Sequence, residues 1–68
     1  DPAYAPGVGN PEAVGITSRE LFDMVHSLKE TKVTGVDIVE LNPYHDNGAT
    51  ASLAAKIIST MIALNLSK

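Results

Sequence analysis

The segment "VDIVELNP" (residues 36–43) places carboxylates where an apolar run ends. Glu40 stands just before the breaker pair Asn42-Pro43, and Asp37 lies three residues earlier. A carboxylate at the end of a buried strand can hold a planar cation by two charge-assisted hydrogen bonds. It can also pair with a Lys or Arg of a neighbouring element, and spacing alone favours that ion pair for Glu40. Asp37 points to the opposite face of such a strand, where it either orients a neighbouring histidine or loop, or bonds to a helix cap.

Other polar residues that could do chemistry lie in loops. His45 and Asp46 follow Glu40 in "NPYHDNGAT" and belong to the same side of the molecule. Their composition favours solvated loop residues, and a place at a pocket entrance is the alternative; Tyr44 is a candidate for the rim of the same pocket. Asn10 in "GNPE" is typical of a turn, with the wall of a substrate pocket as the alternative.

Composition excludes several classes of site. The chain has 68 residues, a net charge of -3, two histidines and no cysteine. One small domain is the upper bound at this length, and thiolate metal sites, disulfides and a basic nucleic-acid surface are excluded. Lys56 and several Ser and Thr residues interrupt the most apolar stretch, so we expect no membrane span. The lack of cysteine suits a reducing compartment, and we expect the cytoplasm.

The first half of the chain predicts a loop followed by a helix. Residues 1–16 contain three prolines and three glycines, which favours an ordered loop at a functional site. A helix is predicted over residues 17–31, because "TSRE" fits a capping box between Thr17 and Glu20. Its buried face is expected to consist of Leu21, Met24, Val25 and Leu28.

The second half predicts a strand and a second helix. Residues 33–41 form a nearly continuous apolar run, typical of a parallel strand covered on both faces. Residues 50–66 predict a helix that is apolar almost all round and therefore buried on several sides. A single strand cannot pair with itself, and the chain begins with Asp1 instead of Met. We therefore expect a processed or excised part of a larger α/β domain.

Three motifs resemble the C-terminal part of the ureohydrolases, the family of arginase and agmatinase. They are "DPAYAPGVGNPE", "GIT" and "GVDIVELNP", and the resemblance extends over essentially residues 1–68. The first looks like the continuation of the family's aspartate-rich metal motif, and the last looks like its final sheet strand. "GVGNPE" is more similar to agmatinases than to arginases.

The resemblance implies both a fold and a reaction. The fold would be a three-layer, mostly parallel, doubly wound sheet, of which this chain is the loop–helix–strand–helix end. The reaction would be hydrolysis of a guanidino compound by two manganese ions, with agmatine giving putrescine and urea, as in polyamine biosynthesis. It also implies a homo-oligomer, a trimer or hexamer, and the remainder of the parent chain as a partner. Neither nucleic acid nor a membrane is implied.

The family's functional residues carry over to individual positions. Glu40 matches the glutamate that holds the substrate guanidinium group, and Asn10 falls where arginases have a threonine close to the substrate. Asp1 matches the last aspartate of the metal motif, so we expect the metal ligands upstream and none in this chain. As a chain end Asp1 is expected to be frayed; in an intact parent it would tie the loop to the metal motif. Val14 and Ile16 replace a glycine and a leucine of the family's "GGLT".

A non-catalytic role is the alternative reading. The chain would then be a folding fragment or an assembly module that acts through its apolar C-terminal helix, residues 50–66. In either case the 68-residue chain alone is expected to be inactive, because the metal ligands and most of the sheet would be missing.

Overall fold

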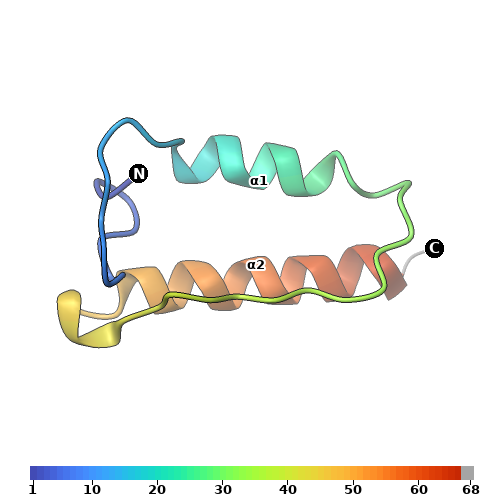
Figure 1. The fold of residues 1–68 in the computed structure, drawn as a ribbon. Coiled ribbons are helices and arrows are strands. Elements are labelled where there is room, and N and C mark those ends of the chain that lie inside the picture. Colours follow the sequence, from blue (N-terminus) through green and yellow to red (C-terminus); the bar gives the residue numbers. More distant parts are fainter. Residues whose placement is uncertain (67–68) are drawn as a thin grey trace.

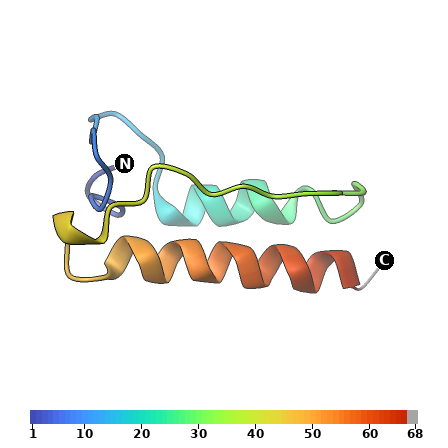
Figure 2. The same ribbon diagram turned by 60° about the horizontal axis from the view of Figure 1, so that its bottom comes forward.

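The computed structural model describes residues 1–66 and contains two α-helices joined by an extended crossover. The helices are α1, Ser18–His26, and α2, Ala49–Leu66, and a single 3-10 turn, η1, spans Pro43–His45. α1 and α2 run in the same direction and contact each other, while the extended segment between them returns in the opposite direction (Figure 1). A second view shows the three pieces alongside one another, with the loop 1–16 at the end where both helices begin (Figure 2).

α1 begins as the sequence predicts and ends earlier. The Glu20 amide donates to the Thr17 hydroxyl at 3.0 Å, and the Thr17 amide donates to the Glu20 carboxylate at 2.9 Å, so the capping box is confirmed. The prediction that the helix reaches residue 31 is wrong, because it ends at His26 and residues 27–30 are turns. Bonds of the i to i−3 type, such as Leu28 N–H to Val25 C=O, tighten the chain there.

The predicted buried face of α1 is only partly formed. Val25 is buried against the rest of the chain and Leu21 is half-buried. Met24 and Leu28 are exposed, contrary to the prediction. A large part of their apolar surface is left uncovered by the described residues, which fits a helix that lacks part of its surroundings.

Residues 33–41 are extended but form no strand in the described chain. Their single ladder contact is an isolated antiparallel bridge between Leu41 and Val8 of the first loop. Strands exist only in pairs, and residues 1–66 supply no second strand for this segment. Val36, Ile38 and Val39 are consequently exposed, and the parallel sheet stays a prediction.

α2 confirms the second predicted helix, starting one residue earlier than expected. Among its described residues only Thr50 and Met61 are buried, although Ile58, Ile62 and Leu66 are large apolar side chains. By length and composition α2 could cross a membrane, but the core helix of a globular protein passes the same test. Its apolar circumference therefore fits a helix made to be covered by further layers.

The described chain is more open than an independent domain of its size. Its radius of gyration is 12.7 Å, whereas a compact domain of this length has roughly 11 Å. Among residues 1–66 the buried apolar core consists of Val25 and Met61 alone. These two observations agree with the expectation that the chain is one portion of a larger α/β domain.

Candidate functional site

The first loop is closed by Asp1. One carboxylate oxygen accepts from the Ala3 amide and the other from the Gly15 amide, each at 2.9 Å. The Asp1 nitrogen donates to the Ile16 carbonyl, also at 2.9 Å. Asp1 is half-buried and holds both ends of the loop together, so the expectation of a frayed residue is wrong.

Close packing against Asp1 explains Gly15, and the neighbouring Val14 has a strained backbone. A Cβ atom on Gly15 would lie 2.8 Å from both the Cα and the nitrogen of Asp1, so no larger residue fits there. Val14 has φ +66° and an exposed side chain. A β-branched residue in the left-handed region is disfavoured. The strain falls at the position where the resemblance to the "GGLT" motif implies a glycine.

Glu40 lies where the extended segment meets the first loop. Its side chain is exposed, and its backbone adopts φ +69° in the left-handed region. Immediately after it, Leu41 bridges Val8, and the Asn42 amide donates to the Gly7 carbonyl at 2.7 Å. The structure therefore brings Glu40 to the edge of the Gly7–Asn10 turn.

The cationic partner that spacing favoured for Glu40 is not observed. Within residues 1–66 the one ion pair joins Arg19 and Asp23 on the exposed side of α1. Asp37 and Asn10 are also exposed; Asn10 lies in a bend two residues after Val8, and Asp37 lies on the free part of the extended segment. Asn10 and Glu40 thus lie on the two segments that the Val8–Leu41 contact joins, Asn10 two residues after Val8 and Glu40 one residue before Leu41. Asp37 is not close to this contact in the sequence.

Three polar groups form a buried contact beside Glu40. The sequence predicted a solvated Asp46 and gave no role to Gly7 or Thr50. The Gly7 amide donates to the Thr50 hydroxyl at 2.7 Å, and this hydroxyl donates to the Asp46 carboxylate at 2.6 Å. Asp46 also accepts from the amides of Thr50 and Gly48, each at 3.0 Å. We call Gly7, Asp46 and Thr50 the loop latch.

The latch also fixes the ionisation of Asp46. The Thr50 hydroxyl, followed by the Gly48 and Thr50 amides, lowers the pKa of the Asp46 carboxyl below its ordinary value, because all three donate to the charged form. The expectation of a solvated loop residue is met only in part, because Asp46 remains partly exposed while its carboxylate is bound to Gly48 and Thr50. Asp46 lies three residues before Ala49, the first residue of α2, so the ordinary N-cap spacing does not identify it.

His45 makes a further contact between the two loops. Its Nδ1 lies 2.6 Å from the Val8 carbonyl oxygen. Because a carbonyl can only accept, Nδ1 carries the proton, and in the neutral ring Nε2 is left as an acceptor. Tyr44, by contrast, is 95% exposed and its backbone amide donates to the Asn42 side chain.

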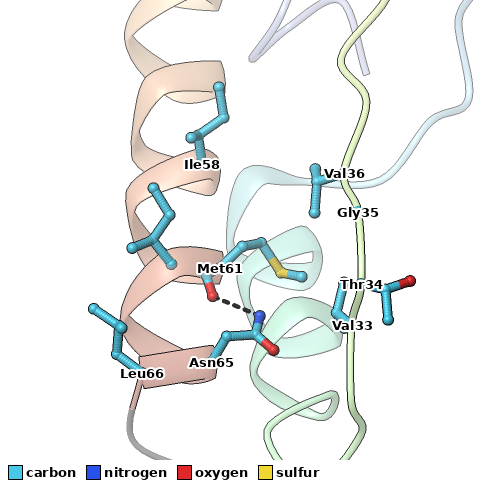
Figure 3. A pocket seen from close by; sticks show the side chains of 9 residues that line it. Val33, Thr34, Gly35, Val36, Ile58, Met61, Asn65 and Leu66 are labelled. Atoms are coloured by element: carbon cyan, nitrogen blue, oxygen red, sulfur yellow. Dashed lines mark hydrogen bonds between the residues drawn. The ribbon is translucent and has the colours of Figure 1, made fainter.

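Two grooves of the described chain lie away from Glu40. A groove of about 370 Å³ is formed by residues 33–36 and the C-terminal half of α2, and the Met61 side chain extends across it toward the extended segment (Figure 3). A second, polar groove lies between α1 and α2, where the Lys56 ammonium sits 5.7 Å from the centre of the Phe22 ring. Neither groove includes Glu40 or Asn10. Both residues are exposed on the open surface of the described chain.

The sequence matches the family described as "Arginase family" over residues 1–63. The chain belongs to the arginase family. It is 48% identical over 65 residues to an agmatinase of Bacillus subtilis, covering 91% of this chain and 22% of the relative. It is 41% identical over 63 residues to the mitochondrial guanidino acid hydrolase of Homo sapiens (91% and 18%) and 42% identical over 65 residues to the mitochondrial arginase 1 of Arabidopsis thaliana (93% and 19%). The chain thus spans about a fifth of the length of these relatives, and no solved structure matches it.

Membership of the arginase family confirms the resemblance seen in the sequence motifs and implies the arginase fold. Among residues 1–66 no three His, Asp or Glu side chains are grouped so that they could hold a metal ion. What this arginase-family chain does offer is the exposed Glu40 carboxylate, held beside a loop that the latch fixes to α2.

Proposed function

We propose that this chain is part of a ureohydrolase that converts agmatine to putrescine and urea, and that Glu40 binds the guanidinium group of the substrate. One observation carries the proposal: in a member of the arginase family, Glu40 presents an exposed carboxylate beside the Gly7–Asn10 turn, and no described cation pairs with it. The enzyme would belong to polyamine biosynthesis in the cytoplasm.

The chemistry of a carboxylate suits this role. A guanidinium group is planar and presents paired N–H donors, so the two oxygens of Glu40 can accept two parallel charge-assisted hydrogen bonds. Once the remaining layers of the domain cover the site, a buried carboxylate needs a positive partner. The substrate would supply that partner, and its guanidinium carbon would be held in a fixed orientation.

The charge distribution favours agmatine over a guanidino acid. Residues 1–16 and 33–55 contain no Lys or Arg, while Asp1, Glu12, Asp37, Glu40 and Asp46 lie within them. A substrate with a second positive charge suits such a surface. A substrate carboxylate would need a cation that these segments do not provide.

The other predicted site residues take supporting roles in the proposal. Asn10 would form part of the pocket wall, Tyr44 and His45 would lie at its rim, and Asp37 would orient a neighbouring group behind the site. Asp1 would fix the loop, as its hydrogen bonds to Ala3 and Gly15 support. We place the two manganese ions on residues outside this chain, because the described residues offer no ligand set.

The proposal also requires partners. The exposed apolar side chains of the extended segment and of α2, including Val39 and Ile62, would be covered by the remainder of the parent chain. A homo-oligomer, a trimer or a hexamer, would complete the assembly. The alternative role as a non-catalytic assembly module through α2 is supported by the same exposed surface.

The test is a matched pair of substitutions in the full-length parent. Glu40→Gln keeps the size of the side chain and removes its charge, and we expect kcat/KM for agmatine to fall by about 10²-fold or more. Glu30→Gln is the control, since Glu30 is an exposed residue of the turn after α1 and should leave kcat/KM unchanged. Urea release from agmatine, arginine and 4-guanidinobutyrate would be compared. Full agmatine hydrolysis by Glu40→Gln would refute the role of Glu40, and faster turnover of a carboxylate-bearing substrate would refute the choice of agmatine.

A further inference from the structure

The Gly7 peptide group joins three segments of the chain. Its N–H donates to Thr50 in the first turn of α2, and its carbonyl accepts from Asn42 at 2.7 Å, two residues after Glu40. A Cβ atom at Gly7 would lie 2.8 Å from the Thr50 Oγ1 and 2.9 Å from the nearer Asp46 oxygen. The loop backbone is therefore pressed onto the side chains of Asp46 and Thr50, and only glycine permits the approach.

The direction of the hydrogen bonds in the latch is determined. The ionised Asp46 can only accept, so the Thr50 hydroxyl proton points toward it. The free lone pair of the hydroxyl is thereby turned toward the Gly7 amide. Thr50 is buried, and its hydroxyl accepts one hydrogen bond and donates one within the latch.

Glu40 needs such support from outside its own segment. A non-glycine residue at φ +69° is disfavoured by about 1–2 kcal/mol and persists only where its surroundings hold it. The contacts that follow it at once are the Leu41 bridge to Val8 and the Asn42 bond to Gly7. Both depend on where the loop residues Gly7 and Val8 lie, and the latch fixes Gly7.

We infer that Thr50 and Asp46 are positioning residues, which hold Gly7 against the end of the extended segment and thereby orient Glu40 toward the guanidino substrate. The inference rests on the proposed function of Glu40. Neither residue touches substrate; their effect passes through the Gly7 peptide. Displacing a substrate-binding group by about 1 Å can cost up to 10²-fold in rate.

The experiment is a double-mutant cycle in the full-length enzyme with agmatine as substrate. Thr50→Val keeps the shape of the side chain and removes both hydrogen bonds, and we expect KM to rise about tenfold with a smaller change in kcat. Thr50→Ser restores the hydroxyl and should return KM to within about threefold of wild type. Thr60→Val is the matched control on the same helix, since the Thr60 hydroxyl donates only to the Lys56 carbonyl of its own helix.

Coupling to Glu40 distinguishes positioning from a merely structural role. In the Glu40→Gln background, Thr50→Val should cost almost nothing further, because there is no carboxylate left to misplace. Equal losses in both backgrounds would overturn the inference. Asp46→Asn is the second variant for the same cycle, so that a Thr50→Val protein that does not fold still leaves a decisive measurement. If Glu40→Gln alone has no effect, the proposed function fails, and this result is distinct from additivity within the cycle.

Discussion

Gly7→Ala is the substitution whose cost the structure specifies most directly. The added methyl group would lie 2.8–2.9 Å from the Oγ1 and Cβ atoms of Thr50 and from an Asp46 oxygen. Thr50 is β-branched and buried, so its side chain cannot rotate away freely, and the loop must move instead. That movement breaks the 2.7 Å bond from the Gly7 amide to Thr50.

The magnitude follows from these two effects. Leaving a buried donor unsatisfied costs about 1–3 kcal/mol, and overpacking costs typically 1–3 kcal/mol more. A total of roughly 2–6 kcal/mol would lower the Tm of a full-length parent by about 4–24 °C, at about 2–4 °C for each kcal/mol. The assay is reversible thermal unfolding of the parent, followed by circular dichroism.

Gly9→Ala is the matched control for this measurement. Gly9 belongs to the same loop, and a Cβ atom there would meet nothing within 4 Å. We expect Gly9→Ala to change the Tm by no more than about 1–2 °C, because surface changes of this kind are usually within ±0.5 kcal/mol. If Gly7→Ala proves as stable as Gly9→Ala, the loop latch does not hold the loop against α2, and the positioning inference loses its basis.

Two further predictions concern backbone strain and pH. Val14→Gly should raise the free energy of unfolding by up to about 1 kcal/mol in a urea titration. Glycine relieves the strain at φ +66°, and this gain exceeds the cost of the entropy that glycine adds to the unfolded chain. Unchanged or lower stability would contradict this account. Because the pKa of Asp46 is lowered in the folded state, its hydrogen bonds add stability above the unfolded pKa, and this contribution is lost as the pH falls through the folded value. Below about pH 4, wild type should therefore lose stability more steeply than Asp46→Asn, and parallel pH profiles of the two proteins would refute the assignment.

Local signals in the sequence were sufficient for the helix starts. The capping box of Thr17 and Glu20 involves neighbours three residues apart, and it forms as predicted. The apolar pattern of α2 likewise predicted a helix over residues 50–66, and the helix spans Ala49–Leu66. Such features depend on nearest turns of one helix and need no knowledge of the rest of the molecule.

Features that depend on distant partners were missed or stay predictions. The strand over residues 33–41 requires neighbouring strands, and none lies within residues 1–66. The latch joins residues 43 positions apart, Gly7 and Thr50, so no periodicity could reveal it. The early end of α1 depends on competing i to i−3 bonds after His26, which apolar spacing does not register.

Regular strand geometry does not describe the backbone at Glu40, the residue proposed to bind the substrate. The prediction that Asp37 and Glu40 point to opposite faces assumed regular alternation along residues 33–41. At φ +69° Glu40 leaves the extended region, so regular alternation ends before it. The backbone directly after Glu40 is held by the contacts of Leu41 and Asn42 with the first loop, and we infer that these contacts, in place of strand parity, orient the carboxylate. If Glu40 binds the substrate as proposed, this arrangement favours a single orientation of its carboxylate, because the first loop contacts the backbone directly after Glu40.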